Sequence, residues 1–384
     1  MTKQNEKDAK RVPELRFKGF TDDWEQRKLG EEFQHINERN DGSFDNTRYI
    51  SVANMYFKDP NEVQSNNILT RTYVMRRDDI AFEGHPSKKY KFGRFVANDI
   101  GDGVVSELFP VYRHVSKYDA KYWKYAIQIE SIMAPLFAKS ITSSGNSSNK
   151  LNPKHFLRQM VNVPDLNEQI KIGEFLSKFD AIITLHEEKY RQLERLKKAL
   201  LQKMFADETG YPALRFKGFT EKWEHHKFKD VLKTHSFRQY LAEPQDNGNF
   251  EVIQQGDTPI IGYANGKPFT NYKEITLFGD HTLSLYKPIG PFFVATDGVK
   301  ILSADGFDGQ YLFATLERYK PKPQGYKRHF TILKNQNMWF TRGNYEQKKI
   351  GEFFTNFDTL ITLHQHKIDN LKRLKRALLQ KMFV

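Results

Sequence analysis

The chain contains one long segment twice. Residues 168–205 read EQIKIGEFLSKFDAIITLHEEKYRQLERLKKALLQKMF, and residues 346–383 read EQKKIGEFFTNFDTLITLHQHKIDNLKRLKRALLQKMF. At an offset of 178 the two copies are identical at 25 of 38 positions. A repeat of this length and similarity constrains the architecture first, because both copies must fold into the same element.

Each copy predicts one long helix with a coiled-coil seam. Neither copy contains proline, and apolar residues recur at steps of three and four, which is the a/d pattern of a coiled coil. At 1.5 Å per residue, 38 helical residues would span about 57 Å. Two polar residues, His186 and Lys197, and their equivalents His364 and Lys375 interrupt the seam. The expected interface residues are Leu176, Phe179, Ile183, Leu193, Leu200, Phe354, Phe357, Ile361, Leu371 and Leu378.

We expect the two helices to pair with each other. Near-identical faces are naturally self-complementary under a two-fold axis, which favours an antiparallel coiled coil. The alternative is that each helix is a separate amphipathic element packed on its own domain.

A shorter repeat, which we call the opening motif, marks where each half of the chain begins. Residues 13–24, PELRFKGFTDDW, and residues 212–223, PALRFKGFTEKW, are identical at nine of twelve positions, whereas the stretches that follow share no convincing similarity. The chain therefore consists of an opening motif, a variable domain and a long helix, twice. The expected boundaries are a disordered lead-in at 1–12, a first variable domain at 13–167, a long helix at 168–205, a linker at 206–211, a second variable domain at 212–345 and a long helix at 346–384.

The predicted fold class is α+β. Residues 48–113 have the β-branched and aromatic content of strands, and residues 25–33 and 119–138 predict helices. The second variable stretch consists of short apolar runs separated by Gly, Pro, Asn and Asp, which favours a β-rich domain with prominent loops. We therefore expect two mixed α/β, β-rich domains joined by an antiparallel coiled coil, in a pseudo-two-fold internal repeat.

Composition narrows the class of partner. Lys and Arg number 60 against 47 Asp and Glu, a formal charge of +13, and 14% of residues are aromatic. A basic, aromatic-rich chain favours nucleic acid, and the alternative is an acidic protein partner. There are no cysteines, no run of 18 apolar residues and no apolar signal-peptide core, so we expect a cytoplasmic protein that does not span a membrane.

Basic residues cluster in loops together with aromatic and small polar residues. Lys and Arg neutralise phosphates, while Asn, Gln, Ser and Arg can bind base edges. For any single residue, a solvated surface charge is the simpler explanation, so the clusters count as sets. The predicted DNA-binding residues are Lys88, Lys89, Lys91, Arg94, Lys150, Lys154, Arg158, Tyr263, Asn265, Lys267, Lys322, Lys327 and Arg328.

Sequence signatures of catalysis are missing. No GxxxxGK[ST] nucleotide-binding loop occurs, and the glycines at 101 and 103 lack the rest of a dinucleotide fingerprint. His364 and His366 are two residues apart, so on a helix they point in different directions. We expect no catalytic residues, no metal site and no cofactor bound by this chain.

This layout resembles the specificity subunit of type I restriction–modification systems. The resemblance rests on the opening motifs PELRFKGF and PALRFKGF and on the helix motif EQxKIGEF…FD…ITLH…L…LKxALLQKMF, and it extends from residue 13 to residue 384. It implies that each variable domain is a target recognition domain that binds half of a split sequence in double-stranded DNA. It also implies that the paired helices set the spacer between half-sites and dock two modification subunits.

The same resemblance implies further partners and cofactors. The modification subunits would bind S-adenosylmethionine and methylate adenine, and restriction subunits would add ATP- and Mg-dependent translocation and cleavage. One departure concerns the loop SSGNSSNK, followed by VNVP, in the first half. The second half reads WFTRGNYEQKK and shows no equivalent Ser–Gly loop. The competing function is a coiled-coil scaffold for protein interaction whose basic charge is incidental.

Overall fold

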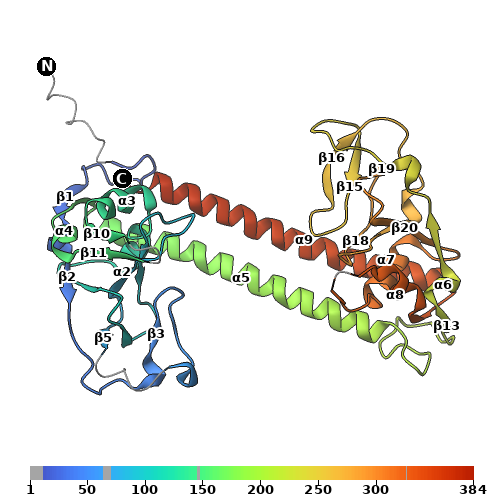
Figure 1. The fold of residues 1–384 in the computed structure, drawn as a ribbon, viewed down its shortest axis with the longest axis horizontal. Coiled ribbons are helices and arrows are strands. Elements are labelled where there is room, and N and C mark those ends of the chain that lie inside the picture. The colour runs from blue at the N-terminus through green and yellow to red at the C-terminus, as the bar shows by residue number, and fades with distance from the viewer. Residues whose placement is uncertain (1–11, 64–70, 145–147, 326) are drawn as a thin grey trace. The chain divides into compact units, whose positions relative to one another are not determined.

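The computed structural model describes residues 12–63, 71–144, 148–325 and 327–384. The expected disordered lead-in lies almost entirely outside these residues. The chain divides into two compact units (Figure 1). Unit 1 consists of Met1–Leu185 and Ile368–Val384, and unit 2 consists of His186–Lys367. Each unit thus contains one opening motif, one variable domain, the first part of one long helix and the last part of the other.

Unit 1 is built on a four-stranded antiparallel sheet of order β2-β9-β6-β7, with two-stranded pairs β1-β12, β3-β4, β5-β8 and β10-β11. Its helices are α1 (Leu29–Glu32), α2 (Ala120–Ala126), α3 (Glu130–Ala138), α4 (Pro153–Leu157) and the first part of α5 (Leu166–Met204). Its strands are β1 (Glu25–Lys28), β2 (Phe33–Ile36), β3 (Ile50–Ser51), β4 (Tyr56–Phe57), β5 (Thr72–Met75), β6 (Ile80–Glu83), β7 (Arg94–Ala97), β8 (Gly103–Ser106), β9 (Val111–His114), β10 (Ile141–Ser144), β11 (Asn149–Leu151) and β12 (Met160–Val163).

Two helix predictions in unit 1 were wrong in extent. Residues 25–33 form strand β1, the single turn α1 and the start of β2, because strands β12 and β9 take up the backbone hydrogen bonds on either side. Leu29 and Phe33 are both buried, so the helical i, i+4 spacing reflects only that short turn. Residues 119–138 form α2 and α3 rather than one helix, because a tight turn with buried Ile127 and Ile129 ends α2.

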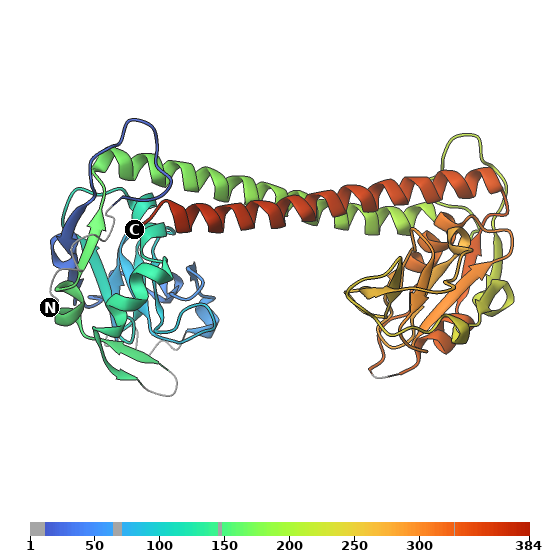
Figure 2. The same ribbon diagram turned by 90° about the horizontal axis from the view of Figure 1, so that it is seen from above.

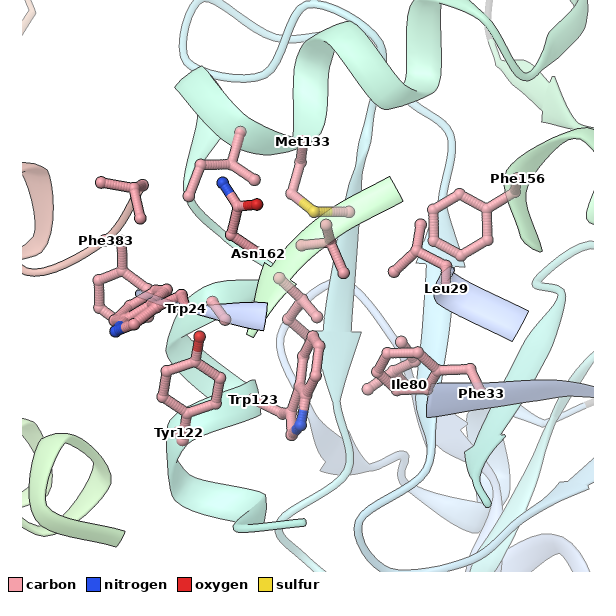
Figure 3. Close-up of a pocket in the computed structure, with 15 residues that line it drawn as sticks. Trp24, Leu29, Phe33, Ile80, Tyr122, Trp123, Met133, Phe156, Asn162 and Phe383 are labelled. Carbon is pink, nitrogen blue, oxygen red and sulfur yellow. The ribbon is translucent and has the colours of Figure 1, made fainter. Parts of the chain in front are cut away.

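The core of unit 1 gathers aromatic residues from distant segments. Trp24 of the first opening motif packs edge-on against Tyr122 and Phe383, with ring centroids 6.3 Å apart in both pairs, and Figure 3 shows these three rings together. The cavity beside them holds about 10 Å³, which is at most the space of one water molecule. This space is therefore part of the packed core and not a ligand site.

Unit 2 contains the sheets β14-β20-β17-β18 and β16-β15-β19 and the pair β13-β21. Its helices are α6 (Phe228–Val231), α7 (Gly309–Arg318), α8 (His329–Asn335), the last part of α5 and the first part of α9 (Asn344–Lys381). Its strands are β13 (Glu224–Lys227), β14 (Leu232–His235), β15 (Phe250–Ile253), β16 (Ile260–Ala264), β17 (Thr276–Gly279), β18 (Leu285–Tyr286), β19 (Phe292–Val294), β20 (Val299–Ala304) and β21 (Asn337–Phe340).

The two variable domains share a frame that their sequences do not reveal. Strand order β2-β9-β6-β7 in unit 1 corresponds to β14-β20-β17-β18 in unit 2, and the pair β1-β12 corresponds to β13-β21. The helices also correspond. The single-turn helix α1 matches α6, the largely buried helix α2 matches α7, and the short helix α4, which precedes the last strand before the long helix, matches α8. The units differ most in the strands and loops inserted into this frame.

The repeated motif EQxKIG is explained by contacts that occur in both units. Arg16 donates two hydrogen bonds to the Glu168 carboxylate at 2.7 and 2.8 Å, and Arg215 donates two to Glu346 at 2.7 and 2.9 Å. The side-chain oxygens of Gln169 and Gln347 accept the backbone N–H of the residue that caps α2 or α7. Hydrogen bonding to buried Glu168 raises the pKa of Arg16, so the pair stays ionised.

The long helices meet inside each unit, and they run antiparallel there. In unit 1, the end of α9 lies beside the start of α5 (Figure 2). Lys375 of α9 pairs there with Asp180 of α5. In unit 2, Lys197 of α5 pairs with Asp358 of α9, and the His186 and His364 rings approach at 3.2 Å. The polar interruptions of the seam are therefore satisfied by partners on the other helix. The expected antiparallel pairing is confirmed, and each helix also packs its first turns on its own domain.

The helices otherwise agree closely with the sequence pattern. Their bounds are Leu166–Met204 and Asn344–Lys381, against the expected 168–205 and 346–384. Among the described residues, no helix combines the length and apolar character needed to cross a membrane.

Candidate nucleic-acid interface

In unit 1, two basic loops from distant parts of the sequence are joined by their backbones. The loop at 84–93 follows β6, and the hairpin of β10 and β11 precedes α4. The Asn149 N–H donates to the Gly84 carbonyl at 2.9 Å. A Cβ at Gly84 would lie 2.2 Å from the Asn149 carbonyl oxygen, so only glycine permits this approach. The junction brings Lys88, Lys89 and Lys91 to the same region as Lys150.

The lysines of this loop are exposed and surround a buried tyrosine. Tyr90 is buried, with the Lys89 ammonium 4.8 Å and the Arg94 guanidinium 5.4 Å from its ring centroid. Lys88, Lys89 and Lys91 are exposed, and they can meet phosphates directly. Arg94 is half-buried and donates to the Ala53 carbonyl at 2.5 Å, so its guanidinium is engaged within the fold.

Helix α4 continues the same surface. The Asn152 side chain caps it by accepting the His155 N–H at 3.1 Å, and buried Phe156 anchors it to the core. The predicted residues Lys154 and Arg158 are exposed on this helix and at its end. Figure 1 shows α4 next to β11, where Lys150 lies.

Unit 2 contains a junction at the same place in the frame. Asp280 directly follows β17, as Gly84 follows β6. The His329 N–H donates to the Asp280 carbonyl at 2.8 Å, and the Phe330 N–H donates to its carboxylate at 2.9 Å. The segment before α8, with the predicted residues Lys322, Lys327 and Arg328 all exposed, occupies the chain position of the β10–β11 hairpin.

This arrangement bears on the missing Ser–Gly loop of the second half. At the chain position where the first half has the Ser–Gly loop, between the helix after the central sheet and the short helix before the last strand, the second half has a basic segment that includes Lys320, Lys322 and Arg328. Proline and glycine replace serine and asparagine, so a comparison of residue types alone cannot align the two loops. The strand VNV of β12 likewise corresponds to NMWF of β21.

The other predicted residues of unit 2 lie on strand β16 and in the turn that follows it. Tyr263 is on β16 and exchanges backbone hydrogen bonds with Gln245 at 2.8 and 2.9 Å. The Asn265 side chain accepts the Asn249 N–H at 3.0 Å, and Lys267 follows in the same turn. All three predicted residues are exposed, and they form a group separate from Lys322, Lys327 and Arg328.

The sequence pattern does not predict a cleft of about 500 Å³ that lies beside the Asp280–His329 junction of unit 2. Its cationic residues are Arg238, Lys300 and Arg328, and the Lys300 ammonium lies 3.6 Å from the Asp280 carboxylate. Burial lowers the pKa of His235, which also lines the cleft. These residues come from four separated segments, so only Arg328 stood in a basic cluster that the sequence displays.

The predicted coiled-coil residues divide between the units. Leu176, Ile183, Leu193 and Phe354 are buried. The other six are half-buried: Phe179, Leu371 and Leu378 in unit 1, and Leu200, Phe357 and Ile361 in unit 2. Among the described residues, no three His, Asp or Glu side chains gather as a metal ion would require.

Comparison with known proteins connects this geometry to one family. Residues 104–195 match the model of the type I restriction modification DNA specificity domain. The S subunit of a type I restriction-modification system from M. genitalium has a similar structure, with a TM-score of 0.64 and 15% identity, over 97% of this chain and 99% of that one. A chain from a solved type I R-M system, in a structure describing complex assembly and conformational transition, matches with a TM-score of 0.52 and 17% identity, over 94% and 97%.

No curated protein sequence matches the chain. The structural likenesses extend over nearly the whole length of both partners, and at this identity they establish the fold. The residues matched by the family model run from β8 of unit 1 through most of α5. The resemblance drawn from the repeats is thereby confirmed: part of the chain matches the type I restriction modification DNA specificity domain, and the chain has the fold of solved type I S subunits.

Proposed function

We propose that this chain is the DNA specificity subunit of a type I restriction–modification complex and that each variable domain reads one half of a bipartite target. The observation that carries the proposal is the loop junction found in both units. Gly84 with Asn149 and Asp280 with His329 join equivalent loops in a shared frame, while the side chains on those loops differ. A common frame with different loops suits two readers of two different half-sites.

The long helices would set the spacer and dock two modification subunits. Support comes from exposed apolar residues at equivalent positions of the repeat: Leu185 and Leu363 are 64% and 59% exposed, and Leu196 and Leu374 are 48% and 49% exposed. Large apolar side chains that are exposed to solvent at equivalent positions of a repeat are typical of a surface that binds two copies of one partner. Leu185→Ser and Leu363→Ser should therefore each weaken co-purification with the modification subunit, while Glu188→Ser on the same helix should not.

The chain itself would perform recognition and assembly, without catalysis. S-adenosylmethionine would be bound by the modification subunits, and ATP and Mg by restriction subunits. The residues proposed to contact DNA are exposed cations and polar groups on loops, which bind and orient but offer no nucleophile–base pair.

A methylation map tests this function. The chain is co-expressed with its modification subunit in a host without other DNA methylation, and N6-methyladenine is located across the genome by long-read sequencing. One split motif with two short defined halves and a fixed gap is the expected result. Assembly of the complex without any new methylation would contradict it and favour the scaffold alternative.

Two charge-reversal variants distinguish a DNA-binding subunit from a protein-interaction scaffold. Lys88→Glu/Lys89→Glu/Lys91→Glu should abolish methylation of the motif while the complex still assembles. The control is a triple reversal with the same change in charge at exposed sites outside the loops, at Lys18, Lys28 and Lys171. Equal loss in both variants would show that overall charge, and not the loop, supports binding.

A further inference from the structure

We propose that a basic cleft in unit 1 binds phosphates of the duplex next to the half-site read by that unit, and that its counterpart in unit 2 does not. The inference rests on the proposed function and extends DNA contact from the variable loops to the long helices. The cleft holds about 730 Å³ and lies between α2, α5, α9 and the loop at 84–93. Its charged lining residues are Lys89, Lys124, Asp180, Lys372, Lys375 and Arg376.

The floor of the cleft is an ordered polar network. The Tyr125 hydroxyl donates to the Asp180 carboxylate at 2.7 Å, and Lys375 binds the other oxygen of the same group. The Lys375 ammonium also lies 4.9 Å from the Tyr125 ring centroid. Asp180 is the single carboxylate among the lining residues, and it is already occupied by this network.

The rim of the cleft is cationic. Lys89, Lys372 and Arg376 are exposed, and Lys124 pairs with Asp99 at 2.6 Å, with both side chains about half exposed. Five Lys and Arg side chains therefore line a single concave surface; Lys375 is paired with Asp180 and Lys124 with Asp99, and the proposal uses the exposed charges of Lys89 and Arg376. Such a surface attracts a polyanion, because low-dielectric walls concentrate the field of the charges.

Two observations favour DNA over an acidic protein. First, Lys89 belongs to the loop whose neighbours Lys88 and Lys91 form the proposed DNA interface, so the cleft is continuous with that interface. Second, five of the eleven lining residues come from the variable domain, through Lys89, α2 and the turn that follows it. A partner that docks on the repeated helices would use surfaces present in both halves of the chain.

The equivalent surface in unit 2 is neutralised. At the offset of 178, Glu194 stands where unit 1 has Lys372, and Lys198 stands where it has Arg376. Lys197, the equivalent of Lys375, is only 7% exposed and is bound by Glu317 at 2.6 Å as well as by Asp358. Unit 2 therefore carries a carboxylate, Glu194, at a position where unit 1 carries a lysine, and its buried lysine is paired with two carboxylates. The asymmetry makes the proposal testable inside one chain.

The test measures the salt dependence of DNA affinity. The complex of the full chain with its modification subunits is titrated against a labelled duplex that carries the mapped motif, and against the same duplex with scrambled half-sites. Each phosphate contact contributes about 0.9 to the slope of log K against log salt, so between 50 and 200 mM salt one contact accounts for about 3.5-fold in affinity. Arg376→Gln should lower the slope by about 0.9, and Lys89→Gln/Arg376→Gln by about 1.8, or about 12-fold over that range.

Two controls accompany these variants. Lys198→Gln removes the equivalent charge in unit 2 and should leave the slope unchanged, and Arg376→Lys should retain it. An unchanged slope in Arg376→Gln, or an equal reduction in Lys198→Gln, overturns the proposal, as does a loss of modification-subunit binding with normal DNA affinity. Failure of the proposed function looks different, because the wild-type complex would then not distinguish the motif from the scrambled duplex.

Discussion

The end of the chain should contribute directly to the stability of unit 1. Phe383 is 6% exposed, stacks on Tyr122 at 5.4 Å and meets Trp24 edge-on. Replacing a buried phenylalanine by alanine typically costs about 3–5 kcal/mol, through lost burial and the cavity left behind. Because Phe383 lies beyond the end of α9, where the backbone can relax, we expect a loss near the lower figure.

The appropriate assay resolves the two units separately. A loss of about 3 kcal/mol corresponds to about 150-fold in an opening equilibrium, and hydrogen exchange followed by mass spectrometry reports such openings segment by segment. In Phe383→Ala, amides of β12 and α2 should exchange faster by that order, whereas those of β21 and α7 should be unchanged.

A matched variant completes the experiment. Phe205 is the equivalent residue in unit 2, is 1% exposed and stacks on Tyr311 at 5.8 Å. Phe205→Ala should therefore accelerate exchange in β21 and α7 and spare β12 and α2. If Phe383→Ala left β12 and α2 unaffected, the assignment of the α9 terminus to the core of unit 1 would be refuted.

Three further predictions concern the frame and the buried polar groups. In Gly173→Ala the new Cβ would lie 2.3 Å from the Asp119 carboxylate oxygen, so we expect a loss of about 1–3 kcal/mol in denaturant titrations. Burial lowers the pKa of His114 to about 3. Since the unfolded chain binds this proton below about pH 6.5, the stability of the fold should decrease as pH falls from about 6.5 towards 3. His114→Gln should flatten the dependence of Tm on pH over that range. Lys197→Met should leave both Asp358 and Glu317 without their cation. Since these carboxylates are partly exposed, we expect a loss of about 1–2 kcal/mol, below that of a fully buried pair, and the double variant with Asp358→Leu should recover part of it in a double-mutant cycle.

Local pattern and internal repetition were sufficient for the architecture. A heptad seam is a property of consecutive residues, so the two helices, their pairing and their polar interruptions could be predicted from the sequence alone. The basic loops around Lys88 and Lys322 were also visible, because their members are contiguous in the chain. The repeated EQxKIG motif could be seen in the sequence, but its reason, the Arg–Glu pairs and the glycine contacts, became evident only in the structure.

Tertiary structure decided what distant segments do together. Residues 25–33 carry a helical spacing, yet strand partners far along the chain take up their hydrogen bonds. The common frame of the two variable domains is a matter of strand order, which unrelated sequences can share. The unit 2 cleft with Arg238 and Lys300, and the unit 1 cleft that unites Lys89 with Arg376, bring together charges from separate elements. The sequence by itself determines which charged residues the chain carries. Folding determines which cations lie close enough together to attract one anion and which are neutralised by a neighbouring carboxylate.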